Sequence, residues 1–239
     1  MRRQRRPIAV RRAPPAALLA GKRVFVLKNV RIIFSKTGRA KFVSHLDLVR
    51  TMSRAVRRAG IPLWYTEGFN RHPYLTFAAP LSLGYEGLRE SMDFRLEEEM
   101  DGDTIVERLN DVFPEGIRAI AADEASAKAK ELTAAEYRMN IGCSAEDVQA
   151  LLSSSEILGE KRTKKKTMKT MDIRPYFANA VVESADSSSS VMMVTLPCGS
   201  AENINPGLIL SALSAVTGRE VEADIVRLRL LKADGTEFL

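Results

Sequence analysis

Two histidines are the residues of this chain best suited to acid–base chemistry. The 239-residue sequence contains only His45 and His72, and imidazole titrates near neutral pH. One histidine as base and the other as acid would suffice for metal-free RNA cleavage, although such histidines are more often structural. Asp47 would complete a two-His, one-carboxylate metal set, but a His-x-Asp pattern is common. We therefore predict no metal site and a non-catalytic protein, with His45, Asp47 and His72 as the catalytic candidates.

An arginine-rich helix is predicted around His45. Ser44 can cap the free N–H groups at its start, Asp47 suits its first turn, and Gly60 suits its end. At 100° per residue, the apolar side chains of residues 48–59 fall on one face and four arginines on the opposite face. Such a face is often merely solvated, but the guanidinium fork also matches phosphate, and an acidic protein is a further alternative. The four candidate binding residues are Arg50, Arg54, Arg57 and Arg58.

A second group of polar residues lies in the stretch 65–84, which is rich in glycine and proline. These residues restrict the backbone path, because proline sets φ and glycine permits positive φ. Short strands are predicted at Leu63–Tyr65 and Tyr74–Phe77, so the polar side chains would lie on a connection, where functional groups are commonly displayed. The alternative is a hairpin corner whose polar groups satisfy the turn backbone. The candidate binding residues are Asn70, Arg71 and His72, together with Ser44 from the helix start.

Positive charge is concentrated in the first part of the chain. Residues 1–60 carry 17 basic side chains and one acidic side chain, a net charge of +16, whereas residues 61–239 carry 19 and 29, a net charge of −10. This polarity favours a polyanionic partner, most often RNA. An acidic protein partner and a solubilising tail are the alternatives. A further basic run contains Lys164, Lys165 and Lys166, and it predicts either a second phosphate-contacting patch or a lysine-protected edge strand.

The sequence carries no pattern that would hold a cofactor. Its two cysteines, Cys143 and Cys198, are far apart, and no CxxxCxxC run is present for an iron–sulfur cluster. A phosphate-binding glycine loop and a dinucleotide fingerprint are also missing, so we predict no cofactor. Low cysteine use is typical of the reducing cytoplasm. No stretch reaches the ~18 apolar residues of a membrane-spanning helix, so no membrane partner is expected.

The order of predicted elements repeats once along the chain. Each half follows the order β-α-β-β-α-β, with one extra short strand in the first. We therefore predict an α+β protein of two tandem ferredoxin-like sandwiches, with helices on one face of each antiparallel sheet. The boundaries are a disordered basic arm or upstream-start extension at 1–29, a first domain at 30–122, a linker at 123–133 and a second domain at 134–239. Further expected strands are Val30–Phe34, Ser91–Leu96, Gly116–Ala121, Tyr137–Gly142, Lys161–Ile173, Phe177–Glu183, Val191–Leu196 and Asp224–Leu231, and further expected helices are Thr104–Phe113, Ser144–Leu152 and Pro206–Val216.

Several short motifs resemble those of a known family. An F-x-S-H-L-D motif spans Phe42–Asp47 and a G-F-N-x-H-P block spans Gly68–Pro73. Further along are Pro80-Leu81 with Gly84, the Asp172-Ile173-Arg174-Pro175 turn, and Asn205-Pro206. Together they resemble the radical-SAM-associated (radical-SAM-linked) family, a domain of unknown function found alone or fused behind radical SAM proteins. The resemblance implies a radical SAM protein as partner and a setting of RNA or ribosome maturation.

Three observations together predict a function: the uneven charge along the chain, the absence of cysteines for an iron–sulfur cluster, and the family resemblance. We expect a non-catalytic accessory protein of a radical SAM enzyme that binds RNA or presents substrate. The alternatives are a metal-independent ribonuclease or RNA-processing enzyme that uses His45 and His72, and a protein-only adaptor. The sequence makes no prediction of the oligomeric state.

Overall fold

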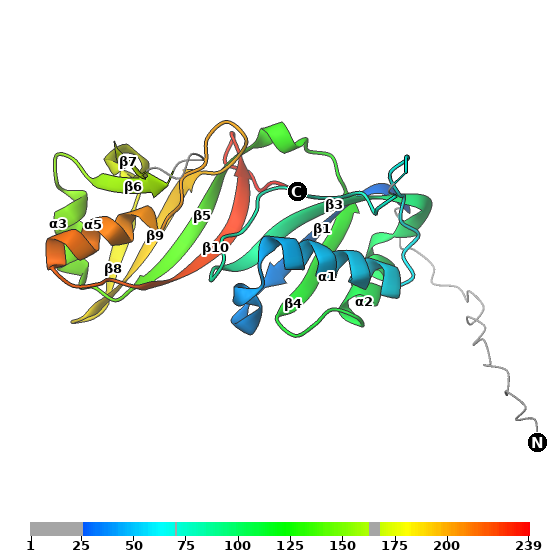
Figure 1. The fold of residues 1–239 in the computed structure, drawn as a ribbon, viewed down its shortest axis with the longest axis horizontal. Coiled ribbons are helices and arrows are strands. Elements are labelled where there is room, and N and C mark those ends of the chain that lie inside the picture. The colour runs from blue at the N-terminus through cyan, green and yellow to red at the C-terminus, as the bar shows by residue number, and fades with distance from the viewer. Residues whose placement is uncertain (1–25, 70, 163–167) are drawn as a thin grey trace, which may run out of the picture.

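One mostly antiparallel sheet of eight strands forms the body of the protein (Figure 1). The computed structural model describes residues 26–69, 71–162 and 168–239. The strand order is β4-β1-β3-β10-β5-β9-β8, and β2 pairs separately with β3. The sheet strands are β1 (Val26–Lys36), β2 (Leu75–Phe77), β3 (Glu86–Asp101), β4 (Ile117–Glu124), β5 (Leu132–Ile141), β8 (Val181–Asp186), β9 (Ser189–Pro197) and β10 (Ala223–Lys232).

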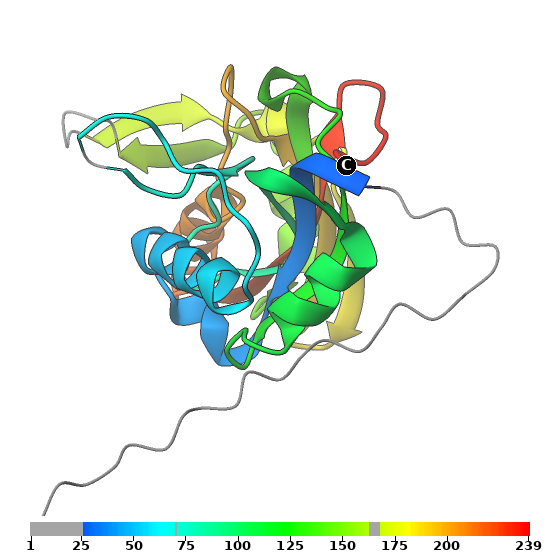
Figure 2. The ribbon, with the colours of Figure 1, turned by 90° about the vertical axis from the view of Figure 1, so that its right-hand side faces the viewer.

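Helices pack against this sheet in two groups. The helix-side residues of β1 and those of α1 and α2 share one apolar cluster, and β5 and β9 share a second cluster with α3 and α5. Figure 2 shows α1 and α5 on the same side of the sheet. The predicted α+β class is therefore confirmed. The helices are α1 (His45–Arg58), α2 (Gly102–Asn110), α3 (Ala145–Leu152), α4 (Arg174–Phe177) and α5 (Leu208–Thr217), with short 3-10 turns at Gly38–Phe42 and Ala129–Glu131.

The two halves meet within the sheet, whereas a separate sheet was expected for each half. β10 pairs in parallel with the start of β3, where Val226 lies opposite Glu86 and Arg227 opposite Gly87. The short strand β2 pairs with β3 only at residues 92–94, so the first residues of β3 have a free edge that β10 occupies. All other strand pairs are antiparallel.

The prediction of a strand at Leu63–Tyr65 is wrong. This segment forms only two isolated bridges, Leu63 with Leu96 and Tyr65 with Pro73. Leu63 is nevertheless buried, and Tyr65 packs against the apolar cluster of the first half. The apolar pattern therefore reflected burial of alternate residues without a continuous hydrogen-bonded ladder.

The region expected as strands Lys161–Ile173 and Phe177–Glu183 is divided differently. A separate two-stranded sheet pairs β6 (Leu158–Arg162) with β7 (Met168–Asp172). The one-turn helix α4 then begins at Arg174, and Pro175 suits its first turn because proline lacks the N–H that is unpaired there. The sheet strand β8 starts only at Val181.

No helix among the described residues is long and apolar enough to cross a membrane.

Candidate functional site

The start of α1 holds two of the predicted residues in a capping interaction. The Asp47 backbone N–H donates to Ser44 Oγ (3.2 Å), and Ser44 Oγ–H donates to Asp47 Oδ2 (2.7 Å). Arg50 Nη1 donates to Asp47 Oδ1 at 2.9 Å. The hydrogen bond from Ser44, and then that from Arg50, lowers the pKa of Asp47. Ser44, Asp47 and Arg50 thus stabilise the first turn, and Arg50 is already paired with a carboxylate.

The remaining arginines of α1 have no carboxylate partner among the residues described. Arg54, Arg57 and Arg58 are exposed, and Arg57 Nε donates to the Ser53 carbonyl at 3.3 Å. Exposed Arg108 of α2 lies next to the end of α1, because its Nη1 donates to the Gly60 carbonyl at 3.3 Å. We call Arg54, Arg57, Arg58 and Arg108 the α1 arginine surface. Sequence reasoning missed Arg108 because its proximity to α1 arises from packing across 48 residues.

Other basic residues in the first part of the chain are neutralised internally. Buried Arg31 forms a two-pronged ion pair with Asp93, with both N–O distances at 2.7 Å. Lys41 pairs with Asp224 at 2.9 Å. The carboxylates of both pairs come from the acidic remainder of the chain, so the charge polarity of the sequence overstates the free positive charge on the surface.

The two histidines have different surroundings. His45 packs its ring edge-on against Phe77, with centroids 5.3 Å apart, and the described residues give it no hydrogen bond. His72 is exposed, and its Nδ1 lies 3.1 Å from Thr66 Oγ1. These contacts anchor each histidine locally and do not link them as an acid–base pair. Within the described part of the chain, no three His, Cys, Asp or Glu residues gather in a way that could hold a metal ion.

The remaining predicted binding residues are only partly described. Arg71 is exposed beside His72. Asn70, Lys164, Lys165 and Lys166 lie outside the described residues, as does residue range 1–25 of the basic arm.

A row of buried charged residues crosses the sheet where the two halves join. Lys36 on β1 and Arg227 on β10 both lie opposite Gly87 on β3, and both are almost completely buried. Arg227 Nε donates to Glu90 Oε1 at 2.8 Å, and its Nη2 pairs with the other carboxylate oxygen. A Cβ on Gly87 would overlap the Glu90 carboxyl group, so the missing side chain makes room for this carboxylate. We call Lys36, Glu90 and Arg227 the junction charge row.

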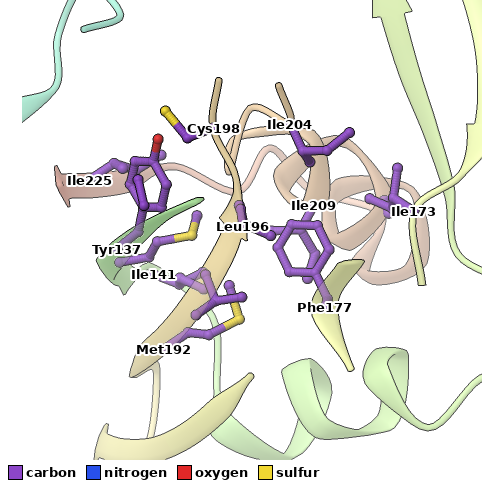
Figure 3. Packing of buried hydrophobic residues seen from close by; sticks show 14 of the residues in the cluster. Tyr137, Ile141, Ile173, Phe177, Met192, Leu196, Cys198, Ile204, Ile209 and Ile225 are labelled. Atoms are coloured by element: carbon purple, nitrogen blue, oxygen red, sulfur yellow. The ribbon is translucent and has the colours of Figure 1, made fainter. Parts of the chain in front are cut away.

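Burial changes the acid–base behaviour of the groups around this row. Burial lowers the pKa of Lys36, while Glu90 opposes that change. For Arg227, burial alone would lower the pKa, and the adjacent Glu90 carboxylate more than offsets it. Burial raises the pKa of Tyr137 to about 12 and also raises the pKa of the Cys198 thiol. Figure 3 shows the Tyr137 hydroxyl pointing toward Cys198 within the core of the second half.

A cavity of about 230 Å³ lies next to the junction charge row. Its walls come from the connection before β3, the turn before α5, and the strands β5 and β10. Asn205 organises one wall, because its Oδ1 accepts from Tyr85 O–H (2.6 Å) and from Gly207 N–H (2.8 Å). The lining residues that carry hydrogen-bonding side chains are Ser82, Tyr85, Tyr137, Asn203, Asn205 and Arg227.

Sequence reasoning did not identify this cavity. Pro80-Leu81 and Asn205-Pro206, noted as motifs, do line it, but nothing local showed that they meet. The available signal was Arg227 between the apolar residues Val226 and Leu228 of a predicted strand, together with Gly87 close before another strand. A charged residue in an apolar strand indicates a buried partner, although the partner itself is 137 residues away.

Comparison with known proteins identifies a family for this chain. A family model described as "Uncharacterized protein conserved in bacteria (DUF2344)" matches residues 29–206. The search of curated proteins returns no match.

Two solved structures show a distant likeness. The "Crystal Structure of a Cbf5-Nop10-Gar1 Complex" is 10% identical, with 84% of this chain and 48% of that chain covered and a TM-score of 0.47. This chain thus spans about half the length of that one. An unknown protein from Galdieria sulphuraria is 13% identical, with 84% and 98% covered and a TM-score of 0.26. Both TM-scores are below 0.5, so we draw no inference from them.

Proposed function

The chain belongs to this family of proteins conserved in bacteria, and from that premise we propose that it is a non-catalytic accessory protein of a radical SAM enzyme that binds RNA. The observation that carries the RNA part is the α1 arginine surface. Its guanidinium groups are exposed at one end of a helix whose opposite face is buried, and none has a carboxylate partner in the described residues. Guanidinium forks of this kind match phosphate oxygens, with which they can form two parallel hydrogen bonds.

Aromatic side chains do not add to this surface. Leu63 and Tyr65 pack into the helix-side core, so Trp64 between them faces the other side of the sheet. There it contacts Tyr74, with ring centroids 6.0 Å apart, and Arg95. The proposed contact with RNA is therefore electrostatic and directed at the phosphate backbone of the RNA. Such binding has low specificity for the RNA sequence and depends strongly on salt.

We also propose that each half of the sheet is a ferredoxin-like unit, with residues 125–131 connecting the two. Support comes from the strand orders β4-β1-β3-β2 and β10-β5-β9-β8, each with two helices on one face. In this arrangement β6, β7 and α4 are an insertion in the second unit. The proposed compartment is the cytoplasm, which suits the two free, buried cysteines.

A filter-binding titration with single-stranded RNA tests the RNA proposal. The variant replaces Arg54, Arg57 and Arg58 by Gln, which keeps helix propensity and removes three positive charges. Because each phosphate contact contributes about 0.7 to the salt slope for single strands, we expect the slope of log K against log salt to become shallower by about 2.

A control variant separates local contact from net charge. It replaces Arg138, Arg174 and Arg219, which are exposed on the second half, by Gln. This variant should bind as the unmodified protein does. No RNA binding at ~50 mM salt, or an equal loss of affinity in both variants, would contradict the proposal.

The radical SAM association is supported by the motifs FxSHLD and GFNxHP, and it needs a separate test. The tagged full chain should capture a radical SAM protein from a bacterial extract, and nuclease treatment should weaken the capture if RNA bridges the two. Capture that survives nuclease and high salt would instead favour a protein-only adaptor. Absence of any radical SAM protein from the captured material would argue against the association.

A further inference from the structure

The junction charge row carries more positive than negative charge in a place that water hardly reaches. Lys36 is 1% exposed and Arg227 is 2% exposed, and their formal charges are balanced by Glu90 alone. Buried ions are ordinarily paired, because removing an ion from water is costly. Apart from the electrostatic contact with Glu90, Lys36 Nζ donates to the Lys41 carbonyl at 3.2 Å. One negative charge is therefore missing from this part of the described structure.

Arg227 connects this charge imbalance to the adjacent cavity. Its Nε and Nη2 are well occupied by Glu90 and by the Ala79 carbonyl at 2.8 Å. Its Nη1 has two long contacts, the Pro80 carbonyl at 3.5 Å and Cys198 Sγ at 3.8 Å, and the Tyr137 hydroxyl also interacts with the guanidinium group. A good hydrogen bond is shorter than these, so Nη1 retains donor capacity, and Arg227 lines the cavity.

Donors from other elements line the same cavity. Asn205 uses its Oδ1 for Tyr85 and Gly207, which orients the amide and leaves its Nδ2 with two N–H groups and no partner among the described residues. The hydroxyls of Ser82 and Tyr137 also line the space. Arg227 and Asn205 thus bring N–H donors to this cavity, and a ligand with oxygen acceptors would complement them.

We propose that this cavity is a binding site for a small molecule that carries an oxyanion, a phosphate or a carboxylate group, with Arg227 and Asn205 as its principal donors. The volume corresponds to roughly eight water molecules in the liquid, which limits the ligand to a small metabolite-sized group. Apolar walls from Leu81, Ile204 and Leu208 would contact the rest of the ligand. The site is separate from the α1 arginine surface and does not depend on RNA binding.

Titration of the full chain with inorganic phosphate and, separately, with malonate tests the proposal. Binding is followed by calorimetry and by the NMR shift of the Gly207 amide, which neighbours the site. Saturation by phosphate, by malonate or by both, with a dissociation constant below about 10 mM, supports the proposal, and the preferred probe identifies the oxyanion.

The test variant is Asn205→Asp. A carboxylate keeps both hydrogen bonds that Asn205 accepts, and it adds a negative charge to the cavity wall, so affinity should fall roughly tenfold or more. Asn140→Asp makes the same change on the exposed side of β5 and should leave affinity unchanged. If Asn205→Asp does not fold, Ser82→Asp introduces the charge at an exposed lining position and should have the same effect.

Three results would overturn the proposal. They are no saturable binding of either probe, equal affinity in the folded cavity variant and the unmodified protein, and equal weakening by Asn140→Asp. The variant that lacks Arg54, Arg57 and Arg58 should retain probe binding, so failure of the RNA proposal and failure of this one are distinguishable.

Discussion

Gly87 shows how one missing side chain can decide the chemistry of a buried site. Glycine usually weakens a strand, because it adds backbone entropy to the unfolded chain and offers nothing to pack. Here the space above its Cα is filled by the Glu90 carboxyl group, which reaches Arg227 on the next strand. The role of this glycine is therefore to admit a carboxylate between two cations, Lys36 and Arg227.

Replacing Gly87 by Ala should destabilise the protein by about 2 kcal/mol or more, because the new methyl group displaces Glu90 from its buried partner. Urea unfolding measures the loss. Gly142→Ala is the matched control, since its Cβ would meet only the Glu222 carbonyl at an ordinary 3.6 Å. That change should alter stability by less than about 1 kcal/mol. Equal effects of the two substitutions would show that Glu90 can move at little cost.

Residues with local roles could be predicted from the sequence, whereas residues with distant partners could not. Ser44 and Ser144 cap their helices, and Gly218 adopts the left-handed conformation at the end of α5, as local patterns indicate. Arg227 and Glu90 could not be paired, because their contact depends on how β3 and β10 come together. The local signals concern neighbours within four residues, and the junction charge row has none of its partners within that range.

Helix α1 is the element in which local sequence and surface chemistry coincide. Its buried side chains Leu48, Met52, Ala55 and Val56 lie on one face, and its exposed arginines lie on the other. The cap formed by Ser44 fixes where the helix begins and hence the phase of both faces. The apolar face stabilises the helix through tertiary packing, so the arginines need not contribute to stability.

Replacing Ser44 by Ala should lower the free energy of unfolding by about 1 kcal/mol, because the Asp47 backbone N–H loses its acceptor. Thermal or urea unfolding checks this value. Ser53→Ala in the same helix is the control, since the described residues give the Ser53 hydroxyl no hydrogen bond. Alanine is the better helix former, so this control should be neutral or slightly stabilising. A loss in Ser53→Ala as large as that in Ser44→Ala would remove the cap as the cause.

The lengths of strands were harder to predict than their existence. The prediction Ser91–Leu96 became β3, which runs from Glu86 to Asp101. Its acidic end, Glu97–Asp101, has low intrinsic strand preference, but it continues along β1, which reaches back to Val26. Pairing with the long strand β1 therefore outweighs the low strand preference of the acidic residues at this end of β3.

At the scale of the whole molecule, two apolar cores are joined by a part of the sheet that contains buried charged side chains. One core lies under α1 and α2, and the other lies under α3 and α5. Between them, β3 and β10 meet at the junction charge row and the adjacent cavity. The repeated order of elements predicted two similar halves. It did not predict the pairing of β3 with β10, because no local sequence pattern specifies which strand an edge strand pairs with.

A double-mutant cycle on Glu90 and Arg227 measures how much the join depends on this pair. Glu90→Gln leaves two buried cations without a carboxylate and should cost about 3–5 kcal/mol of stability. Arg227→Met should cost less than Glu90→Gln, since Glu90 keeps Lys36 as a buried cationic neighbour. The double variant should be less destabilised than the sum, with a coupling energy of about 1–3 kcal/mol in urea unfolding. Additive losses would mean that the two residues act independently.

The continuity of the sheet through β3 also bears on how the protein could be divided. A cut in the connection between β4 and β5 would leave β3 and β10 in different fragments, each with bare backbone N–H and C=O groups. Such groups readily recruit another strand, from the complementary fragment or from an identical copy. Either fragment produced alone would thus tend to aggregate. The two fragments produced together could reassemble through the same pairing of β3 with β10.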